Sequence, residues 1–277
     1  MRGLSLILCF FLSWAACAQN VMNEDERFQF AEGLFTRGMY DLALKEYDLF
    51  LKDFPAAAKA DVAHFRLGEC QRQLGNRSGA EKEFKIVFAN YPKSAVRFSA
   101  GVRRADLFVD AGQFDAAVDL YGAVLRENPP EDVAATCVYF TGESQLKLGK
   151  KADAAISFEQ VKAKYPKSPF LPYALLKLGA IYGEDPAKAD QVIELYKAVA
   201  AQPGSDRLGA EAAFQMAEVY FKRKDFARSA ESYKSLMKSY PADARTAEAR
   251  LQAAWASHNA GLYADALAAV VEGLKGE

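Results

Sequence analysis

Hydrophobic and small residues recur along the chain at the spacing of one face of an α-helix. Ala43 and Tyr47 are four residues apart, as are Ala80 and Phe84, and later segments repeat this pattern. Residues at this spacing lie on the same side of a helix, where they form a stripe that packs against a neighbour. No segment alternates between apolar and polar residues as a half-buried strand would. The pattern therefore predicts an all-α protein.

A proline ends a similar segment at an almost constant interval of 37 residues, with one interval of 38. These prolines are Pro55, Pro92, Pro129, Pro166, Pro203 and Pro241. Small residues follow the same period, at Ala31, Gly68, Ala105, Gly142, Gly179, Ala217 and Ala254. A glycine turn such as Arg37-Gly38 divides most units, and the proline ends the second helix because it lacks an N–H and clashes with the preceding turn. Each unit is thus predicted to be a helix-turn-helix.

Units of this kind stack on copies of themselves, because each buries an apolar face that it could not bury alone. We expect one right-handed superhelical solenoid of seven repeats over residues 19–277. The repeats cover roughly residues 24–60, 61–97, 98–134, 135–171, 172–209, 210–246 and 247–277. In the fifth, Asp185 as N-cap and Pro186 as first helical residue replace the glycine turn. This predicts either a local change in superhelical pitch near residues 183–203 or a harmless insertion compensated within the repeat.

The order of small, aromatic and proline residues resembles the tetratricopeptide repeat, whose usual period is about 34 residues. The additional residues lie after the proline, in joints such as Tyr91-Pro92-Lys93-Ser94 and Tyr165-Pro166-Lys167-Ser168. With Leu67-Gly68-Glu69, these joints resemble the periplasmic repeats of YbgF-type Tol-Pal coordinators and BamD-type outer-membrane-assembly lipoproteins. The resemblance covers residues 24–277 and implies a scaffold between outer-membrane, peptidoglycan-associated or secretion components. Residues 19–27 are, however, too short for the trimerising coiled coil of YbgF-type proteins, and BamD-type proteins have fewer repeats.

The first eighteen residues stand outside the repeats and have the pattern of a secretory signal. Arg2 precedes an apolar run from Leu4 to Leu12, and small residues follow up to Ala18. The run is shorter than the ~20 residues that span a bilayer. Cleavage after Ala18 is one expectation, and the other is a lipoprotein signal at Trp14-Ala15-Ala16-Cys17, in which Cys17 is acylated. Both predict an exported protein that is periplasmic or associated with the outer membrane, with membrane attachment only through such an anchor.

Composition narrows the classes of function. The chain has 35 Lys and Arg against 36 Asp and Glu, which gives a formal net charge of −1. A nucleic-acid-binding protein would carry a basic stripe to neutralise phosphates, so no nucleic-acid partner is expected. Hydrophobic residues make up 51% of the chain, enough for a continuous core. Outside the signal, Cys70 and Cys137 lie in first helices two repeats apart, too far for a disulfide.

The residues that catalysis would need are scarce. His64 and His258 are the two histidines, and they lie in repeats 2 and 7, too far apart to share a metal or act as a dyad. The motifs HExxH, CxxC and GxSxG are missing, and Gly149-Lys150 lacks the spacing of a phosphate-binding loop. We therefore expect no enzymatic activity, no cofactor and no metal.

The shared surface of the first helices is the predicted site for partners. Its first row is apolar, and the candidates for partner contact are Phe28, Phe65, Tyr139 and Phe214. The row four residues on is acidic in five repeats, at Glu32, Glu69, Asp106, Glu143 and Glu218, and has Trp255 in the last. A third, more variable row contributes Phe35, Arg72 and Phe221. The rows predict either a groove for a peptide with apolar anchors and basic residues or the packing code of the repeats themselves.

The C-terminal end offers a second predicted surface. Repeat arrays usually end in a polar capping helix, but the last helix here carries Leu267, Val270, Val271 and Leu274. We expect self-association or partner docking through repeat 7. The chain as a whole is predicted to be an exported, non-catalytic scaffold that binds proteins or peptides in the bacterial cell envelope. An alternative is binding of a glycan or small molecule in the groove, where the aromatic row would serve by stacking.

Overall fold

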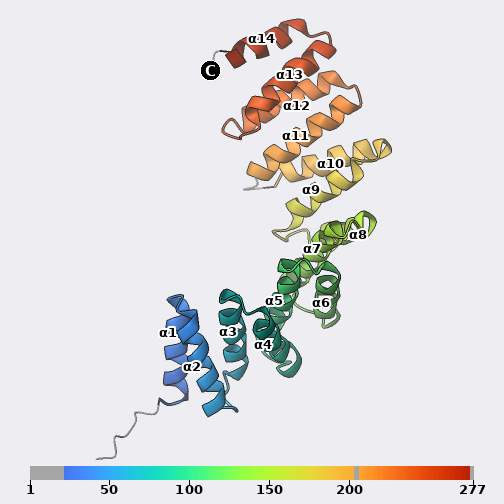
Figure 1. Cartoon of the computed structure of the whole chain (residues 1–277). Helices are drawn as coiled ribbons and strands as arrows, with labels where there is room; N and C mark the ends of the chain where they lie inside the picture. The colour runs from blue at the N-terminus through green and yellow to red at the C-terminus, as the bar shows by residue number, and fades with distance from the viewer. Residues whose placement is uncertain (1–21, 203–205, 275–277) are drawn as a thin grey trace, which may run out of the picture. The chain divides into compact units, whose positions relative to one another are not determined.

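The computed structural model describes residues 22–202 and 206–274, and over these residues it consists of helices and connecting turns with no strand. The helices, labelled in Figure 1, are α1 Glu24–Thr36, α2 Tyr40–Asp53, α3 Ala60–Gln73, α4 Arg77–Asn90, α5 Arg97–Asp110, α6 Phe114–Arg126, α7 Glu131–Lys147, α8 Lys151–Lys164, α9 Leu171–Tyr182, the 3-10 helix η1 Pro186–Lys188, α10 Ala189–Ala200, α11 Asp206–Lys222, α12 Phe226–Ser239, α13 Thr246–Asn259 and α14 Tyr263–Leu274. Two α-helices fall in each predicted repeat. The predicted all-α repeat fold is therefore confirmed.

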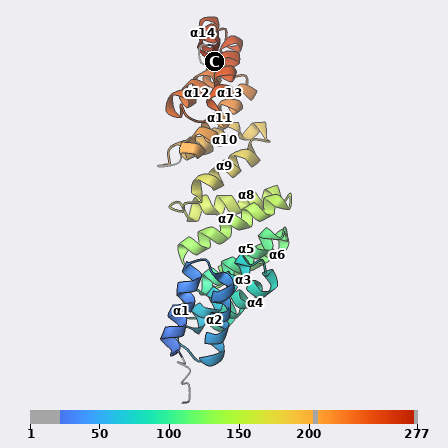
Figure 2. The same ribbon diagram turned by 60° about the vertical axis from the view of Figure 1, so that its left-hand side comes forward.

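The chain divides into two compact units, Met1–Glu83 and Phe84–Glu277. Within each unit, consecutive helices pack antiparallel on one another, so that α13 lies against both α12 and α14 (Figure 2). Whether residues 19–277 act as one domain stays a prediction. Residues 1–21, with the predicted signal and Cys17, lie outside the described residues.

Glycine sets the turn between the two helices of most repeats. Gly38, Gly75, Gly112, Gly149 and Gly261 all have φ between 69° and 76°. This left-handed conformation is open to glycine because it lacks a Cβ, and it lets the chain reverse within two or three residues. The predicted glycine turns are thus confirmed.

The fifth repeat reverses by a different route. Asp185 caps the turn, since its Oδ1 accepts a 3.0 Å hydrogen bond from the Ala187 N–H. Pro186 then opens one turn of 3-10 helix, η1, rather than α10 itself, which begins at Ala189. The expected N-cap is confirmed, and the first helical residue of α10 lies three positions later than predicted. The change in superhelical pitch stays a prediction.

The core of each repeat forms where a small residue of the first helix faces an aromatic residue of the second. Phe158 is fully buried against Gly142, and a Cβ placed on Gly142 would lie 2.7 Å from the Phe158 ring. Tyr196 lies still closer to Gly179, where the same distance would be 2.3 Å. The small residues seen in the sequence therefore mark the closest approach of paired helices. Among the described residues, no helix combines the length and apolarity needed to cross a membrane.

Candidate functional site

Carboxylates of the predicted acidic row make hydrogen bonds inside the chain. Glu32 on α1 accepts a 2.5 Å hydrogen bond from the Tyr47 hydroxyl on α2 and a 2.9 Å one from Arg66 Nε on α3. The corresponding tyrosine pairs of the second unit are Asp106 with Tyr121, at 2.7 Å, and Glu218 with Tyr233. Each pair joins the first helix of a repeat to the second helix of the same repeat. These carboxylates therefore help to hold the two helices of a repeat together.

Where the second helix carries phenylalanine instead of tyrosine, the carboxylate still pairs with a cation, as Glu32 does with Arg66. Glu69 lies 3.1 Å from Arg72 on the same helix, and Glu143 lies 3.0 Å from Lys177 on the next first helix. Because opposite charges this close offset each other, the row presents little net negative charge to a basic peptide. A partner that used these carboxylates would have to displace contacts already present.

Burial governs the ionisation of these pairs. It raises the pKa of the Tyr121 hydroxyl, and the neighbouring Asp106 carboxylate raises it further. Burial also raises the pKa of Asp106, although the Tyr121 hydroxyl and the Arg103 guanidinium oppose that rise. The raised pKa of Tyr121 keeps its hydroxyl protonated, so that it can donate to Asp106.

The apolar row packs into the repeats over most of its length. Phe28 and Tyr139 are only 6% and 7% exposed. Phe28 meets Tyr47 edge-on with ring centroids 6.1 Å apart, and Tyr139 stacks on Phe170 at 4.8 Å. Phe65 and Phe214 are half-buried. Phe28, Tyr139 and Phe214 thus contact rings of their own repeats, and partner contact through this row stays a prediction.

The phenylalanines of the third row pack across the turns. Phe35 lies edge-on to Tyr40, with centroids 5.5 Å apart, and beneath the Arg66 guanidinium at 4.6 Å. Phe221 meets Phe226 in the same way at 5.1 Å. Both phenylalanines thus close the turn between the two helices of a repeat.

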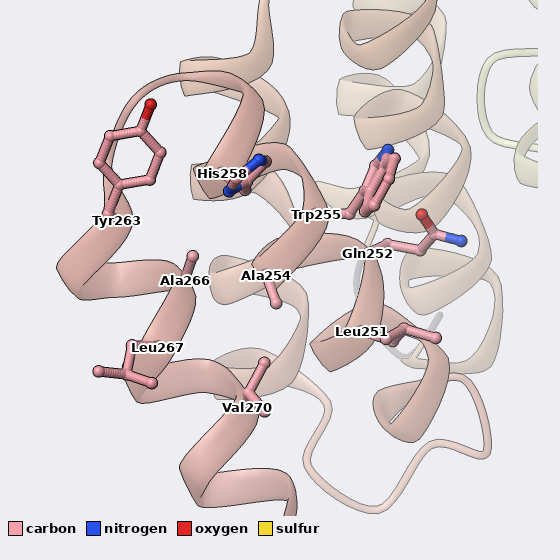
Figure 3. Close-up of a pocket in the computed structure, with 9 residues that line it drawn as sticks. All are labelled: Leu251, Gln252, Ala254, Trp255, His258, Tyr263, Ala266, Leu267 and Val270. Atoms are coloured by element: carbon pink, nitrogen blue, oxygen red, sulfur yellow. The ribbon is translucent and has the colours of Figure 1, made fainter.

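The last repeat differs, because its apolar side chains face solvent. Leu251 and Trp255 on α13 are 68% and 59% exposed, and Leu267 and Val270 on α14 are 66% and 47% exposed. Together they line a groove of about 750 Å³ between the two helices, shown in Figure 3. The remaining lining residues are Gln252, Ala254, His258, Tyr263 and Ala266. This terminal groove is the candidate functional site.

Two sequence changes give the terminal groove its apolar character. Trp255 stands where the preceding repeat has Glu218, and Val270 stands where it has Tyr233. The hydrogen-bonded tyrosine and carboxylate of repeats 1, 3 and 6 are therefore replaced by an indole and an isopropyl group. Valine is also much smaller than tyrosine, which leaves space between α13 and α14.

Comparison with known proteins identifies the repeat. One tetratricopeptide repeat model matches residues 102–169, and a second matches residues 62–94 and 211–243. The chain therefore contains tetratricopeptide repeats. No curated protein matches it in sequence. The narrower resemblance to YbgF-type and BamD-type envelope proteins is not confirmed by these matches and stays a prediction.

Solved structures share the fold of this tetratricopeptide repeat chain. A tetratricopeptide repeat protein from Parabacteroides merdae ATCC 43184 is 18% identical, with a TM-score of 0.56, and the match covers 91% of this chain and 92% of that protein. MamA is 16% identical with a TM-score of 0.54, covering 69% and 96%. PilF of Pseudomonas aeruginosa is 15% identical with a TM-score of 0.53, covering 81% and 95%. At identities this low, the similarity shows the fold alone.

The structure brings together two surfaces that the sequence predicted separately. Trp255 belonged to the predicted row of partner-contact residues and Val270 to the predicted C-terminal face, and both line the terminal groove with Leu267. Val271 is exposed on α14, and the side chain of Leu274 lies outside the described residues. Sequence reasoning missed Tyr263, which follows the glycine turn and closes one end of the groove beside His258, with ring centroids 5.4 Å apart.

Residue types that bind metals do not gather in the described part of the chain, where no group of three or more His, Cys, Asp and Glu could hold an ion. Cys70 and Cys137 both carry free, buried thiols. Burial raises the pKa of each to about 12, so neither is an activated nucleophile. The terminal groove itself offers an apolar surface that a partner can contact.

Proposed function

We propose that the chain is an exported, non-catalytic scaffold that binds proteins or peptides and supports the assembly or organisation of outer-membrane or periplasmic complexes. The observation that carries the proposal is the terminal groove, where Trp255 on the α13 wall is 59% exposed. Exposed apolar clusters in soluble domains mark interaction sites, because covering them removes apolar surface from water. Tryptophan is the residue most enriched at the energetic centre of protein interfaces.

Location in the cell envelope rests on the signal-like pattern of residues 1–18 and on the resemblance of the repeat joints. The N-terminal residue of the mature protein, read by mass spectrometry, tests it. Export by cleavage after Ala18 leaves Gln19 at the terminus, whereas lipoprotein processing leaves an acylated Cys17. A mature protein that retains residues 1–18 and stays in the cytoplasmic fraction would contradict export.

Site-specific photo-crosslinking in the native cell tests the binding function. A photoreactive residue at position 255 should give discrete protein adducts, and the adducts should disappear when Leu267 and Val270 are both changed to Asp. Ile156 on α8 is the matched control, since it is 68% exposed but stands apart from the groove. Circular dichroism checks that each variant stays folded. Equal adducts from positions 255 and 156 would refute a partner site in the groove.

A further inference from the structure

The groove between the two helices of one repeat is normally occupied by the first helix of the next repeat. We call this groove the seat of that helix. In the second unit, α11 lies against α10, and α13 lies against α12. Each such first helix places a small, fully buried residue in this contact. These residues are Ala174 on α9, Ala212 on α11 and Ala249 on α13. Ala249 shares its cluster with Tyr233 and Leu236 of the preceding second helix. A first helix thus contacts its seat through small, apolar side chains.

The terminal groove is a seat of the same construction, and no described helix covers it. Its walls are α13 and α14, which occupy the places of α11 and α12 one repeat earlier, and Trp255 and Val270 face the open space (Figure 3). In occupied seats, the first helix of the next repeat carries a cation toward the carboxylate, as Arg66 does toward Glu32 and Lys177 toward Glu143. In the terminal groove, the indole of Trp255 replaces that carboxylate. A helix bound there should therefore carry an apolar residue at the position that corresponds to Arg66 or Lys177.

Charge at the rim of the seat gives the occupant a direction and a register. Asp25 on α1 pairs with Lys59, just before α3, at 2.7 Å. Glu211 on α11 pairs in the same way with Arg245, just before α13. Both pairs are separated by 34 residues. Glu248 takes the place of Glu211 one repeat later and is exposed, so it is set to receive a cation from the start of an incoming helix.

We propose that the terminal groove binds an amphipathic α-helix of a partner protein, which takes the place of a further first helix. This inference rests on the proposed function and specifies its partner. The helix begins with Lys or Arg opposite Glu248, has a small residue four positions on, and has apolar or small residues eight and eleven positions on. The chain's own α3 shows this pattern at Lys59, Ala63, Leu67 and Cys70. The position that corresponds to Arg66 is apolar in the partner.

A second copy of the chain does not fit the seat through its own first helix. In α1, the position that is small in α9, α11 and α13 is held by Glu26, which is exposed and forms a capping box with Asn23. Docking α1 into the groove would bury this carboxylate without a cationic partner, which is strongly unfavourable. Glu26 therefore acts against head-to-tail stacking of copies.

Tryptophan emission provides the test. Trp14 and Trp255 are the two tryptophans, so the Trp14→Phe variant of the full chain reports on the groove alone. The probe is a synthetic peptide of residues 59–73 with Arg66→Leu and Cys70→Ala. Saturable binding should shift the Trp255 emission to shorter wavelength, because the indole leaves water.

Two controls match the proposed contacts. The same peptide with Ala63→Glu should bind at least about tenfold more weakly, a difference of about 1.4 kcal/mol. Glu248→Lys in the protein should weaken binding several-fold, and a peptide with Lys59→Glu should recover it. Peptides that bind equally whatever the residue at positions 59 and 63 would overturn the proposed register.

An isolated 15-residue peptide forms little helix in water. The second measurement therefore joins the helix to the protein, by adding a copy of residues 55–73 with the same two changes after Glu277, which keeps the repeat register. Emission of Trp255 should move to shorter wavelength in this extended chain and remain unshifted when the added copy carries Ala63→Glu. If neither peptide nor extension moves the emission, the groove is not a helix seat.

The outcomes separate this inference from the proposed function. If position 255 gives protein adducts but neither the peptide nor the extension shifts the Trp255 emission, the proposed binding function stands and the helical partner is refuted. A concentration-dependent doubling of solution mass, abolished by Val270→Glu, would show that a second copy covers the groove and would also refute it.

Discussion

The hydroxyl of Tyr121 on α6 donates a 2.7 Å hydrogen bond to the carboxylate of Asp106 on α5. The two residues are 15 positions apart, one on each helix of a repeat. The same pair recurs at Tyr47 with Glu32 and at Tyr233 with Glu218. In the last repeat, the two positions are Trp255 and Val270, which are exposed. A contact that joins the two helices in three of the repeats is therefore replaced by an apolar opening in the last.

Removing the hydroxyl of this pair should destabilise the protein. Tyr121→Phe removes the hydroxyl that donates to the half-buried Asp106 carboxylate, so the free energy of unfolding should fall by about 1–3 kcal/mol. Urea denaturation followed by circular dichroism measures it. Tyr173→Phe is the control, because Tyr173 is 45% exposed. Equal effects of the two changes would show that the hydrogen bond contributes nothing specific.

The pH dependence of stability should carry the signature of Asp106. Burial raises its pKa above the ordinary 3.8, so the native state binds this proton more tightly than the unfolded chain does. Protonation of Asp106 therefore stabilises the fold below about pH 3.8, and this contribution is lost as the pH rises through the raised pKa.

Comparison with Asp106→Asn isolates this effect. The unfolding free energy of the unmodified protein, minus that of the variant, should decrease between about pH 3 and about pH 7. Denaturation at several pH values measures the difference. A difference that increases over this range would mean that the pKa of Asp106 is lowered in the fold instead.

Close helix contact at Gly179 should make this position intolerant of a side chain. A Cβ there would lie 2.3 Å from the Tyr196 ring, so Gly179→Ala should lower the free energy of unfolding by about 1–3 kcal/mol. Gly33→Ala is the matched control, because nothing lies within 4 Å of its added Cβ. Alanine favours helix over glycine by up to about 1 kcal/mol, so the control should be neutral or stabilising.

Much of this fold could be predicted because single residues with local structural requirements recur from repeat to repeat. Gly38 and its equivalents require positive φ, and Gly142 faces a buried ring, so each residue type follows from its backbone or its nearest neighbour. The 3-10 turn before α10 was less predictable. Asp185 and Pro186 favour any helical start, and the choice between 3-10 and α geometry depends on packing that the sequence alone does not specify.

The candidate site was only half predictable from the sequence. Trp255 and Val270 each stood out, but the first looked like a member of a row and the second like part of a separate end face. Their proximity depends on how α13 and α14 cross, which is a tertiary property. The acidic row showed the opposite problem, because an exposed carboxylate and one that accepts a hydrogen bond from Tyr47 look identical in sequence.

The two buried thiols should be unreactive until the protein unfolds. At a pKa of about 12, roughly one thiol in ten thousand of Cys70 or Cys137 is ionised at pH 8. A disulfide-exchange reagent should therefore label neither in the native protein within minutes. In denaturant without reductant, the protein lacking residues 1–18 should show two reactive thiols. Zero reactive thiols would mean that Cys70 and Cys137 are bridged.

Quenching of Trp255 emission by acrylamide most directly tests the central claim, that the last repeat leaves an apolar groove open. In the Trp14→Phe variant at low protein concentration, quenching should approach that of a tryptophan in a short peptide, and the chain extended by residues 55–73 should be strongly protected. A Trp255 that is already shielded in the unextended, monomeric protein would contradict the account.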